Sequence, residues 1–180
     1  MRIFLGLPIL ANTRKLISNS IAELQKQYAQ DMRFLSPRDY HITLHFLGGL
    51  DVPQIINLVQ ALRPIINKHK NFPIEFDKFT VFPDQQGHCW VLTVKENAQL
   101  QALYQDVGEV LLQQKLRVDK RGYYPHTTIA KKPRSSLMPS VDFPQINFPP
   151  MPAARLLLYV SQQSQAGSCY QALEYFHLLT

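Results

Sequence analysis

The sequence is poor in cysteine and has no long apolar run. Its 180 residues include two cysteines, Cys89 and Cys169, whose number and spacing match neither a disulfide framework nor a zinc site. No apolar stretch approaches the roughly 18 residues that a membrane-spanning helix needs. The first residues lack the small-residue cleavage site of a secretory signal. These absences predict a cytoplasmic protein with no membrane partner and no redox chemistry.

Acidic residues are scarce in one part of the chain. From Lys115 to Arg134 there are seven basic residues and one acidic residue, whereas the rest of the chain has twelve of each. The stretch KRGYYPH, residues 120–126, sets these cations among aromatic rings, a composition that suits the phosphates and bases of RNA. A solvated charged loop explains the same composition as well.

The apolar content of 46% is enough for one compact domain or for two small lobes with a shared core. Three segments have the spacing of amphipathic helices: residues 12–24, a segment capped by Asp51 that reaches residue 66, and a segment capped by Asn97 that reaches residue 111. Candidate strands alternate with them, over residues 2–8, 41–48, 73–82, 88–94, 124–130, 154–162 and 170–178. Short turns between two pairs of strands predict sheets that are at least partly antiparallel.

The pattern His-x-Thr occurs twice, in HITL (residues 41–44) and in HTTI (residues 126–129). The copies are 85 residues apart, close to half the chain, as expected for two similar lobes that each supply one strand. Because side chains alternate along a strand, His41 and Thr43 share a face about 7 Å apart, and His126 and Thr128 do the same. The pattern predicts two polar pairs that face a cleft while their apolar neighbours face the core.

Two facing histidines suit general acid–base catalysis, because an imidazole titrates at about pH 6.5 and can be held neutral or charged. One ring can take a proton while the other gives one. Threonine hydroxyls beside them can donate hydrogen bonds to the non-bridging oxygens of a phosphate as charge builds in a pentacoordinate transition state. A single histidine is more often structural than catalytic, so it is the pairing that favours a phosphoryl-transfer site without a metal.

HITL and HTTI resemble the paired signatures of the two-histidine phosphoesterases. Within that superfamily, the segments IFLGLP, HITLHFLG, PHTTIAK and LYVSQQSQAGSCYQALEYF are most similar to the bacterial and archaeal RNA 2′,3′-cyclic phosphodiesterases, once called 2′-5′ RNA ligases. The resemblance extends over essentially the full chain. It implies an α+β, bilobal two-histidine phosphoesterase fold. Two pseudo-symmetric lobes with mostly antiparallel sheets would line a central cleft, with helices on the outside, in a single catalytic domain over residues 1–180.

The resemblance also implies an activity: hydrolysis of the 2′,3′-cyclic phosphate at an RNA end to a 2′-phosphate, with no metal and no cofactor. His126 would be the base that activates water. His41 would be the acid that protonates the departing 3′ oxygen, and Thr43 and Thr128 would hold the phosphate. RNA ends or cyclic nucleotides are the expected partners of a protein that acts as a monomer.

Three further residues are candidates for substrate binding. Where many relatives have arginine in the pattern HxTxxR, this chain has Lys131, which supplies charge but no bidentate fork. Strict alternation would turn Lys131 away from His126, so it reaches the substrate only if the strand bulges or ends near Ala130. Tyr124 lies beside the second motif and the basic stretch. His45 has the parity of the first histidine and could line the cleft, or be partly solvated near the strand end.

Two alternatives to hydrolysis remain. One is an RNA- or nucleotide-binding module that keeps the fold without significant turnover. The other is a 2′-5′ RNA ligase acting on tRNA halves, which is the reverse chemistry at the same site. A zinc enzyme is not expected, because no H-E-x-x-H or comparable Cys/His spacing occurs in the sequence.

Overall fold

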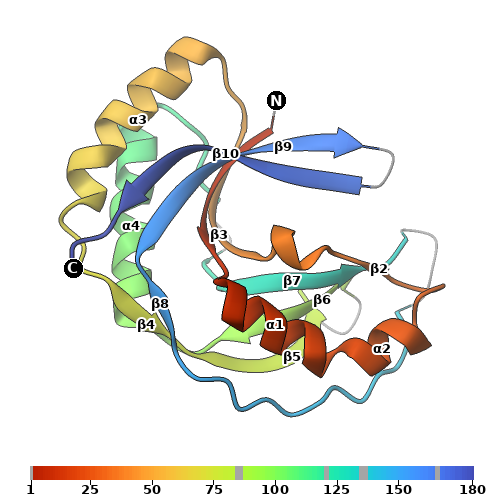
Figure 1. Ribbon diagram of the computed structural model, residues 1–180. Coiled ribbons are helices and arrows are strands. Elements are labelled where there is room, and N and C mark those ends of the chain that lie inside the picture. The colour runs from red at the N-terminus through yellow and green to blue at the C-terminus, as the bar shows by residue number, and fades with distance from the viewer. Residues whose placement is uncertain (1, 84–86, 120–121, 134–137, 165–166) are drawn as a thin grey trace.

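The computed structural model of the protein describes residues 2–83, 87–119, 122–133, 138–164 and 167–180 (Figure 1). In chain order its elements are β1 (Arg2–Pro8), α1 (Ala11–Ser20), α2 (Ala22–Gln27), β2 (Arg33–Phe34), the 3-10 helix η1 (Pro37–Asp39), β3 (His41–Gly49), α3 (Val52–Ile66), β4 (Phe72–Ile74), β5 (Phe76–Phe82), β6 (Cys89–Val94), α4 (Ala98–Gln113), β7 (His126–Lys131), β8 (Met151–Ala153), β9 (Arg155–Ser164) and β10 (Gly167–His177). None of the helices in these ranges is long and apolar enough to cross a bilayer.

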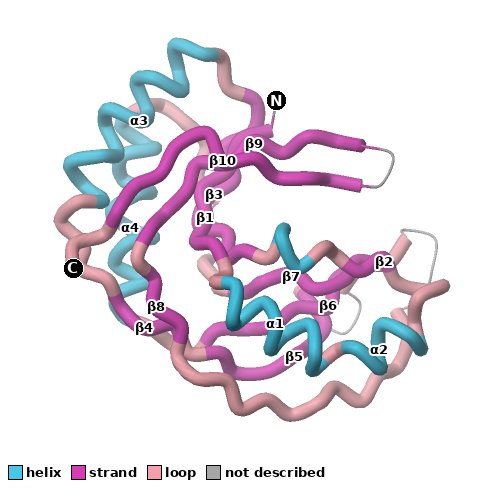
Figure 2. Tube along the Cα trace, viewed as in Figure 1, coloured by secondary structure: helices cyan, strands magenta, loops and turns pink. Residues whose placement is uncertain are grey.

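Most strands belong to one eight-stranded sheet in the order β10-β9-β1-β3-β7-β6-β5, with β2 beside β7. The pairings between its described strands are antiparallel. Outward from the central β3–β7 pair, β1 corresponds to β6 and β9 to β5, and helical segments connect β1 to β3 and β6 to β7. Figure 2 shows the two groups of strands meeting at β3 and β7. The expected α+β fold with two pseudo-symmetric, mostly antiparallel halves is confirmed.

Two of the three predicted helices begin at the predicted caps. The Asp51 carboxylate accepts a hydrogen bond from the Gln54 backbone N–H at 2.8 Å, and the Gln54 side chain accepts one from the Asp51 N–H, which forms a complete capping box. The Asn97 side chain accepts from the Leu100 N–H at 2.9 Å. The first predicted helix is interrupted, because Ile21 leaves the helical conformation between α1 and α2.

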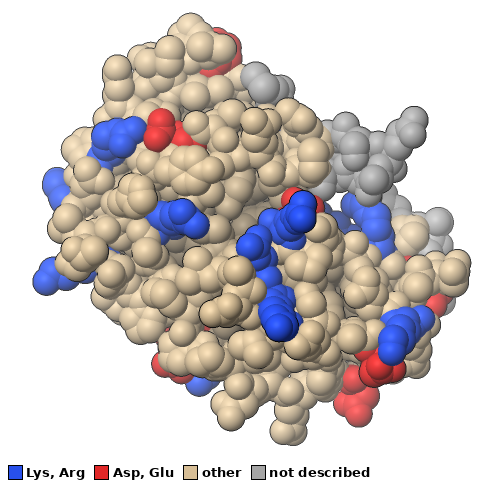
Figure 3. Space-filling model, in the orientation of Figure 1, with Lys and Arg blue, Asp and Glu red and all other residues tan. Residues whose placement is uncertain are grey.

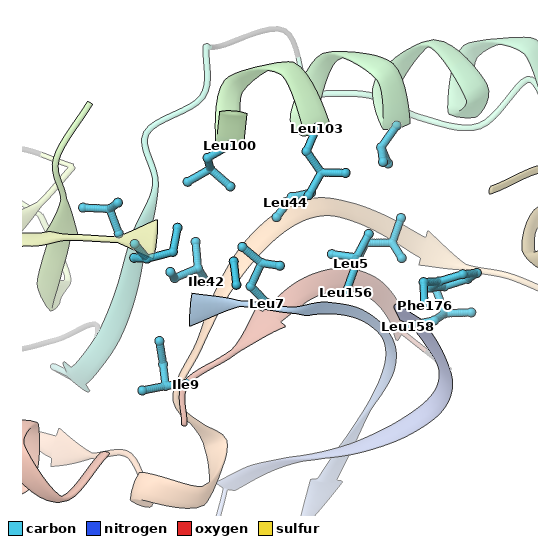
Figure 4. Packing of buried hydrophobic residues seen from close by; sticks show 14 of the residues in the cluster. Leu5, Leu7, Ile9, Ile42, Leu44, Leu100, Leu103, Leu156, Leu158 and Phe176 are labelled. Carbon is cyan, nitrogen blue, oxygen red and sulfur yellow. The ribbon is translucent and has the colours of Figure 1, made fainter. Parts of the chain in front are cut away.

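The helical segment of each half packs on a strand of the other half. Figure 4 shows Leu100 and Leu103 of α4 pointing toward the sheet, where Leu44 of β3 is buried. In the reverse direction, Tyr28 directly after α2 lies edge-on against Trp90 of β6, with ring centroids 5.1 Å apart. The two halves therefore interlock around a shared apolar core. Helices pack against the apolar face of the central sheet.

Candidate active site

Both His-x-Thr strands carry a β-bulge directly after the threonine. The register with β1 skips Leu44 in β3, and the register with β6 skips Ile129 in β7. A bulge of one residue reverses the faces that later side chains occupy. The outward sixth residue of each strand, Phe46 in β3 and Lys131 in β7, therefore lies on the face of the histidines. Strict alternation would turn Lys131 away from His126. The bulge next to Ala130 that is needed to turn it back is present in β7.

The two motifs lie side by side where β3 and β7 meet. Their antiparallel register pairs the middle residue of one motif with the middle residue of the other. One residue further in each direction, Thr43 lies opposite His126 and His41 lies opposite Thr128. Opposite side chains in such a pair have Cβ atoms roughly 4.5–5.5 Å apart, and diagonal neighbours are roughly 7–8 Å apart. The two histidines are diagonal neighbours, each beside a threonine, at a separation that a phosphate can bridge.

Each imidazole is oriented by the backbone two residues earlier. Nδ1 of His41 donates to the carbonyl oxygen of Asp39 at 2.7 Å, and Nδ1 of His126 donates to the carbonyl oxygen of Tyr124 at 2.7 Å. A carbonyl can only accept, so both rings carry the Nδ1 proton. This tautomer leaves both Nε2 atoms available to take a proton or, once charged, to give one.

Aromatic rings surround the imidazole of His41. The ring centroids of Phe4, Tyr170 and Tyr159 lie 4.8, 4.9 and 5.7 Å from it. These three residues cannot be identified from the sequence alone, because they come from β1, β10 and β9, and only the order of the sheet brings those strands to the motif. The single available signal was the prediction that these segments are strands.

Burial lowers the pKa values of both histidines. The pKa of His41 falls to about 4, because desolvation outweighs the backbone hydrogen bond, and the charges of Lys131 and His126 lower it further. Desolvation also lowers the pKa of His126, against the backbone hydrogen bond that raises it. Both imidazoles are thus predominantly neutral near pH 7 when the site is empty. The positive charge of Lys131, which lies on the same face as the histidines, contributes to the lowered pKa of His41.

The fold brings Tyr124 to the second histidine together with Phe82, a residue that no motif in the sequence marks. The Phe82 ring lies 4.3 Å from the His126 ring and stacks on Tyr124 at 5.5 Å, with the two planes 15° apart. The Tyr124 ring is 6.3 Å from the imidazole and 52% exposed. An exposed aromatic ring next to the site can stack on a nucleobase.

The hydroxyls of Thr43 and Thr128 lie on the face of the histidines and are half-buried. Within the described ranges, no hydrogen bond joins either hydroxyl to another residue. Both can therefore donate to a phosphate oxygen without first breaking an internal hydrogen bond.

His45 does not belong to this site, and the prediction that it shares the face of His41 is wrong. The bulge turns its side chain to the opposite face, where it is 2% exposed and stacks on Tyr104 of α4 with centroids 4.3 Å apart. Its Nε2 donates to the Tyr104 carbonyl oxygen at 2.9 Å. Tyr104 in turn stacks on Tyr123 at 4.1 Å. This column of three rings connects β3, α4 and the segment before β7.

The basic stretch is only partly described. Lys120, Arg121 and Arg134 lie outside the described residues. On the face seen in Figure 3, lysine and arginine side chains are spread over the surface and do not form one patch. Among the described residues of this stretch, Lys131 lies on the face of the histidines, and its charge lowers the pKa of His41.

The chain has relatives in sequence. It matches the family described as the 2′-5′ RNA ligase superfamily over residues 14–146. The RNA 2′,3′-cyclic phosphodiesterase of Bacillus subtilis (strain 168) is 36% identical over 132 residues, which cover 72% of this chain and 70% of that protein. A protein of the same name from Thermotoga maritima is 24% identical over 179 residues, covering 96% of this chain and 93% of its own.

The fold also has a counterpart among solved structures. The protein TT0787 of Thermus thermophilus superposes with a TM-score of 0.84 and covers 98% of this chain and 97% of its own, at 18% identity. At this identity the similarity concerns the fold alone. It extends over both halves of the sheet, including the strands that lie outside the sequence family match.

Proposed function

Because the chain belongs to the 2′-5′ RNA ligase superfamily, we propose that it is a metal-independent RNA 2′,3′-cyclic phosphodiesterase that opens cyclic phosphate ends to 2′-phosphates. The observation that carries the proposal is the matched pair of imidazoles, each with Nδ1 fixed to a backbone carbonyl at 2.7 Å and Nε2 available. The relatives add support, because the Bacillus subtilis protein that is 36% identical to this chain is named an RNA 2′,3′-cyclic phosphodiesterase.

The proposed reaction is an in-line displacement at phosphorus. Nε2 of His126 takes a proton from water as the water oxygen attacks. The bond from phosphorus to the 3′ oxygen breaks, and His41 protonates that oxygen. The hydroxyls of Thr43 and Thr128 and the ammonium group of Lys131 stabilise the negative charge on the non-bridging oxygens.

The in-line geometry assigns a side of the site to the substrate nucleoside. The attacking and leaving oxygens lie on opposite sides of phosphorus, and the leaving 3′ oxygen belongs to the ribose. The ribose and its base therefore lie on the side of His41. There the Phe46 ring is 65% exposed and its centroid lies 5.8 Å from that of the buried Phe4 ring, so a base can stack on Phe46.

The pH dependence of the reaction should reflect the lowered pKa values. The mechanism needs one neutral and one charged imidazole, so kcat/KM should follow a bell-shaped profile. The pKa of His41 in the empty site is about 4, and the pKa of His126 is below its ordinary value. The alkaline decline of kcat/KM should therefore begin below about pH 6.5, the ordinary pKa of histidine. A bound phosphate anion raises both pKa values, so the profile of kcat should lie at higher pH.

Initial rates with a nucleoside 2′,3′-cyclic phosphate between pH 4 and pH 9 provide the measurement. The two limbs give apparent pKa values that belong to the coupled pair of histidines. A profile that is flat from pH 5 to pH 9 would contradict the two opposite proton-transfer roles.

The whole chain, residues 1–180, acts as one catalytic domain in this proposal, as a monomer and in the cytoplasm. The interlocked halves and the single sheet support one catalytic domain, because the two histidines come from adjacent strands of that sheet. Free Cys89 and Cys169 suit a reducing compartment.

The proposed function is tested by hydrolysis of a nucleoside 2′,3′-cyclic phosphate in excess chelator. We expect turnover at the same rate with and without chelator, and a 2′-phosphate as the product, identified by chromatography against both isomers. A 3′-phosphate would show that the 2′ oxygen leaves and would overturn the assigned geometry. A protein that binds the cyclic nucleotide without turning it over would be a binding module instead.

A further inference from the structure

The carbonyl groups that orient the two imidazoles lie in different kinds of backbone. The Asp39 carbonyl, which accepts from His41, ends the 3-10 helix η1 and so belongs to a hydrogen-bonded turn. The Tyr124 carbonyl, which accepts from His126, lies in residues 122–125, which form neither a helix nor a strand. The position of this second carbonyl therefore depends on contacts outside regular secondary structure.

Contacts on both sides hold the segment around Tyr124. On its C-terminal side, the Pro125 carbonyl accepts a hydrogen bond from the Val94 N–H at the end of β6, at 3.1 Å. On its N-terminal side, the Tyr123 ring stacks on the Tyr104 ring of α4, with centroids 4.1 Å apart and planes 5° apart. The buried Tyr123 hydroxyl makes no hydrogen bond within the described ranges. The ring of Tyr123, and not its hydroxyl, therefore ties the Tyr124 peptide to α4.

The stack continues from Tyr104 to the central sheet. The His45 ring of β3 lies 4.3 Å from the Tyr104 ring with the planes 10° apart, and its Nε2 donates to the Tyr104 carbonyl oxygen at 2.9 Å. Gly108 of α4 leaves room for this imidazole, because a Cβ there would lie 3.4 Å from Cε1 of His45. Glycine is unfavourable inside a helix, so its presence here fits a helix face shaped around the ring. The column thus begins on the strand that also carries His41.

We infer that the column of His45, Tyr104 and Tyr123 positions the proposed base. The column fixes the Tyr124 carbonyl, and this acceptor holds the proton of the His126 imidazole on Nδ1. Nε2 then has the lone pair with which it takes a proton from water. Without a fixed acceptor the ring can carry its proton on Nε2 instead, and that tautomer cannot act as the base. Tyr104 is thus a positioning residue, and the inference rests on the proposed function for the role of His126.

The variants for the test change the middle ring of the column. Tyr104→Leu removes the ring and leaves an apolar side chain. Tyr104→Phe is the matched control, because it keeps the ring and loses a hydroxyl that donates to the Asp119 carbonyl oxygen at 3.4 Å. Leu111→Ala controls for a general loss of stability, since Leu111 is buried on the same helix and is not part of the column.

The first measurement is the tautomer of each imidazole, from ring nitrogen chemical shifts in NMR spectra of protein with isotopically labelled histidine. It needs no substrate, and at about pH 8 both rings are neutral. Wild type and the two control variants should carry the Nδ1 proton in His41 and in His126. In Tyr104→Leu, we expect a form of His126 with its proton on Nε2, whereas His41 should be unchanged because its acceptor belongs to η1. The variants His41→Asn and His126→Asn assign the two sets of signals.

The second measurement separates a positioning role from a structural one. Tyr104→Leu should lower kcat for the cyclic nucleotide at least about tenfold with KM within about twofold of wild type, because a displacement of about 1 Å can cost about a hundredfold in rate. Combined with His126→Asn, the same change should cause no further loss, because the group through which the column acts is already absent. A role in stability alone would lower the rate in both backgrounds by the same factor. Tyr104→Phe and Leu111→Ala should keep the wild-type kcat.

Two results would overturn the inference. One is an unchanged His126 tautomer in Tyr104→Leu, and the other is a loss of kcat in that variant that is equally large in the His126→Asn background. If Tyr104→Leu does not fold, His45→Leu removes the ring at the other end of the column from a buried position, and the same two results would decide. Absence of turnover by the wild-type protein would instead overturn the proposed function, and the tautomer measurement would still test the column.

Discussion

The variant His126→Asn is expected to hydrolyse a nucleoside 2′,3′-cyclic phosphate about a thousandfold more slowly than the wild-type protein, the usual contribution of a positioned general base. The asparagine amide can still donate to the Tyr124 carbonyl, as Nδ1 of His126 does at 2.7 Å. It has no counterpart of Nε2, so nothing takes the proton from the attacking water. The loss should appear in kcat, measured at substrate concentrations above and below KM.

The control for this variant is another histidine that lies away from the motifs. His177 is exposed on β10, and His177→Asn is expected to keep wild-type kcat and KM. A loss in His126→Asn that falls on KM alone would indicate that the residue only binds the phosphate. A rate within a few-fold of wild type would remove His126 from the chemistry.

The parts of the fold that could be predicted from the sequence depend on local interactions. The side chains of Asp51 and Asn97 cap α3 and α4 by hydrogen bonds that stay within one helical turn, so the residue types alone indicate where these helices begin. The break at Ile21 could not be predicted in this way. Ile17 and Ile21 are both buried, so the apolar period continues through a residue that is no longer helical.

The site could be predicted from the sequence for the residues whose side chains alternate regularly between the two faces of their strand. His41 and Thr43 share a face, as do His126 and Thr128, because each pair precedes the bulge of its strand. Beyond the bulge the same rule gives the wrong face, as it did for His45. A bulge depends on how two strands far apart in sequence are registered, and no residue within the strand encodes that register by itself.

The two bulges also show how an internal repeat can produce an asymmetric site. Phe46 and Lys131 occupy equivalent places on β3 and β7, one aromatic and one cationic. The cation lies on the strand of His126, and its charge lowers the pKa of His41 in the other half. The aromatic side chain lies on the strand of His41, where the in-line geometry places the substrate base. The two similar halves of the fold therefore each supply one imidazole. The different residues at the equivalent positions, Phe46 and Lys131, make the two sides of the site chemically different.

The lowered pKa of His41 makes the assignment of acid and base open to a direct test. At a pKa of about 4, His41 is neutral in the empty site near pH 7, so it can act as the acid only with the charge of the bound phosphate beside it. An acid is needed only when the leaving oxygen is a strong base. The ribose 3′ oxygen is such a base, whereas a 4-nitrophenolate leaves without protonation.

The variant His41→Asn is therefore expected to respond differently to the two leaving groups. It should hydrolyse the cyclic nucleotide about a thousandfold more slowly than wild type, yet stay within about tenfold of wild type on thymidine 3′-(4-nitrophenyl phosphate), because only the first reaction needs the acid. His126→Asn should lose activity on both substrates, since both reactions need activated water. Initial rates of the three proteins on the two substrates give the comparison. The opposite pattern, with His126→Asn tolerant of the nitrophenyl ester and His41→Asn inactive on it, would exchange the roles of the two histidines.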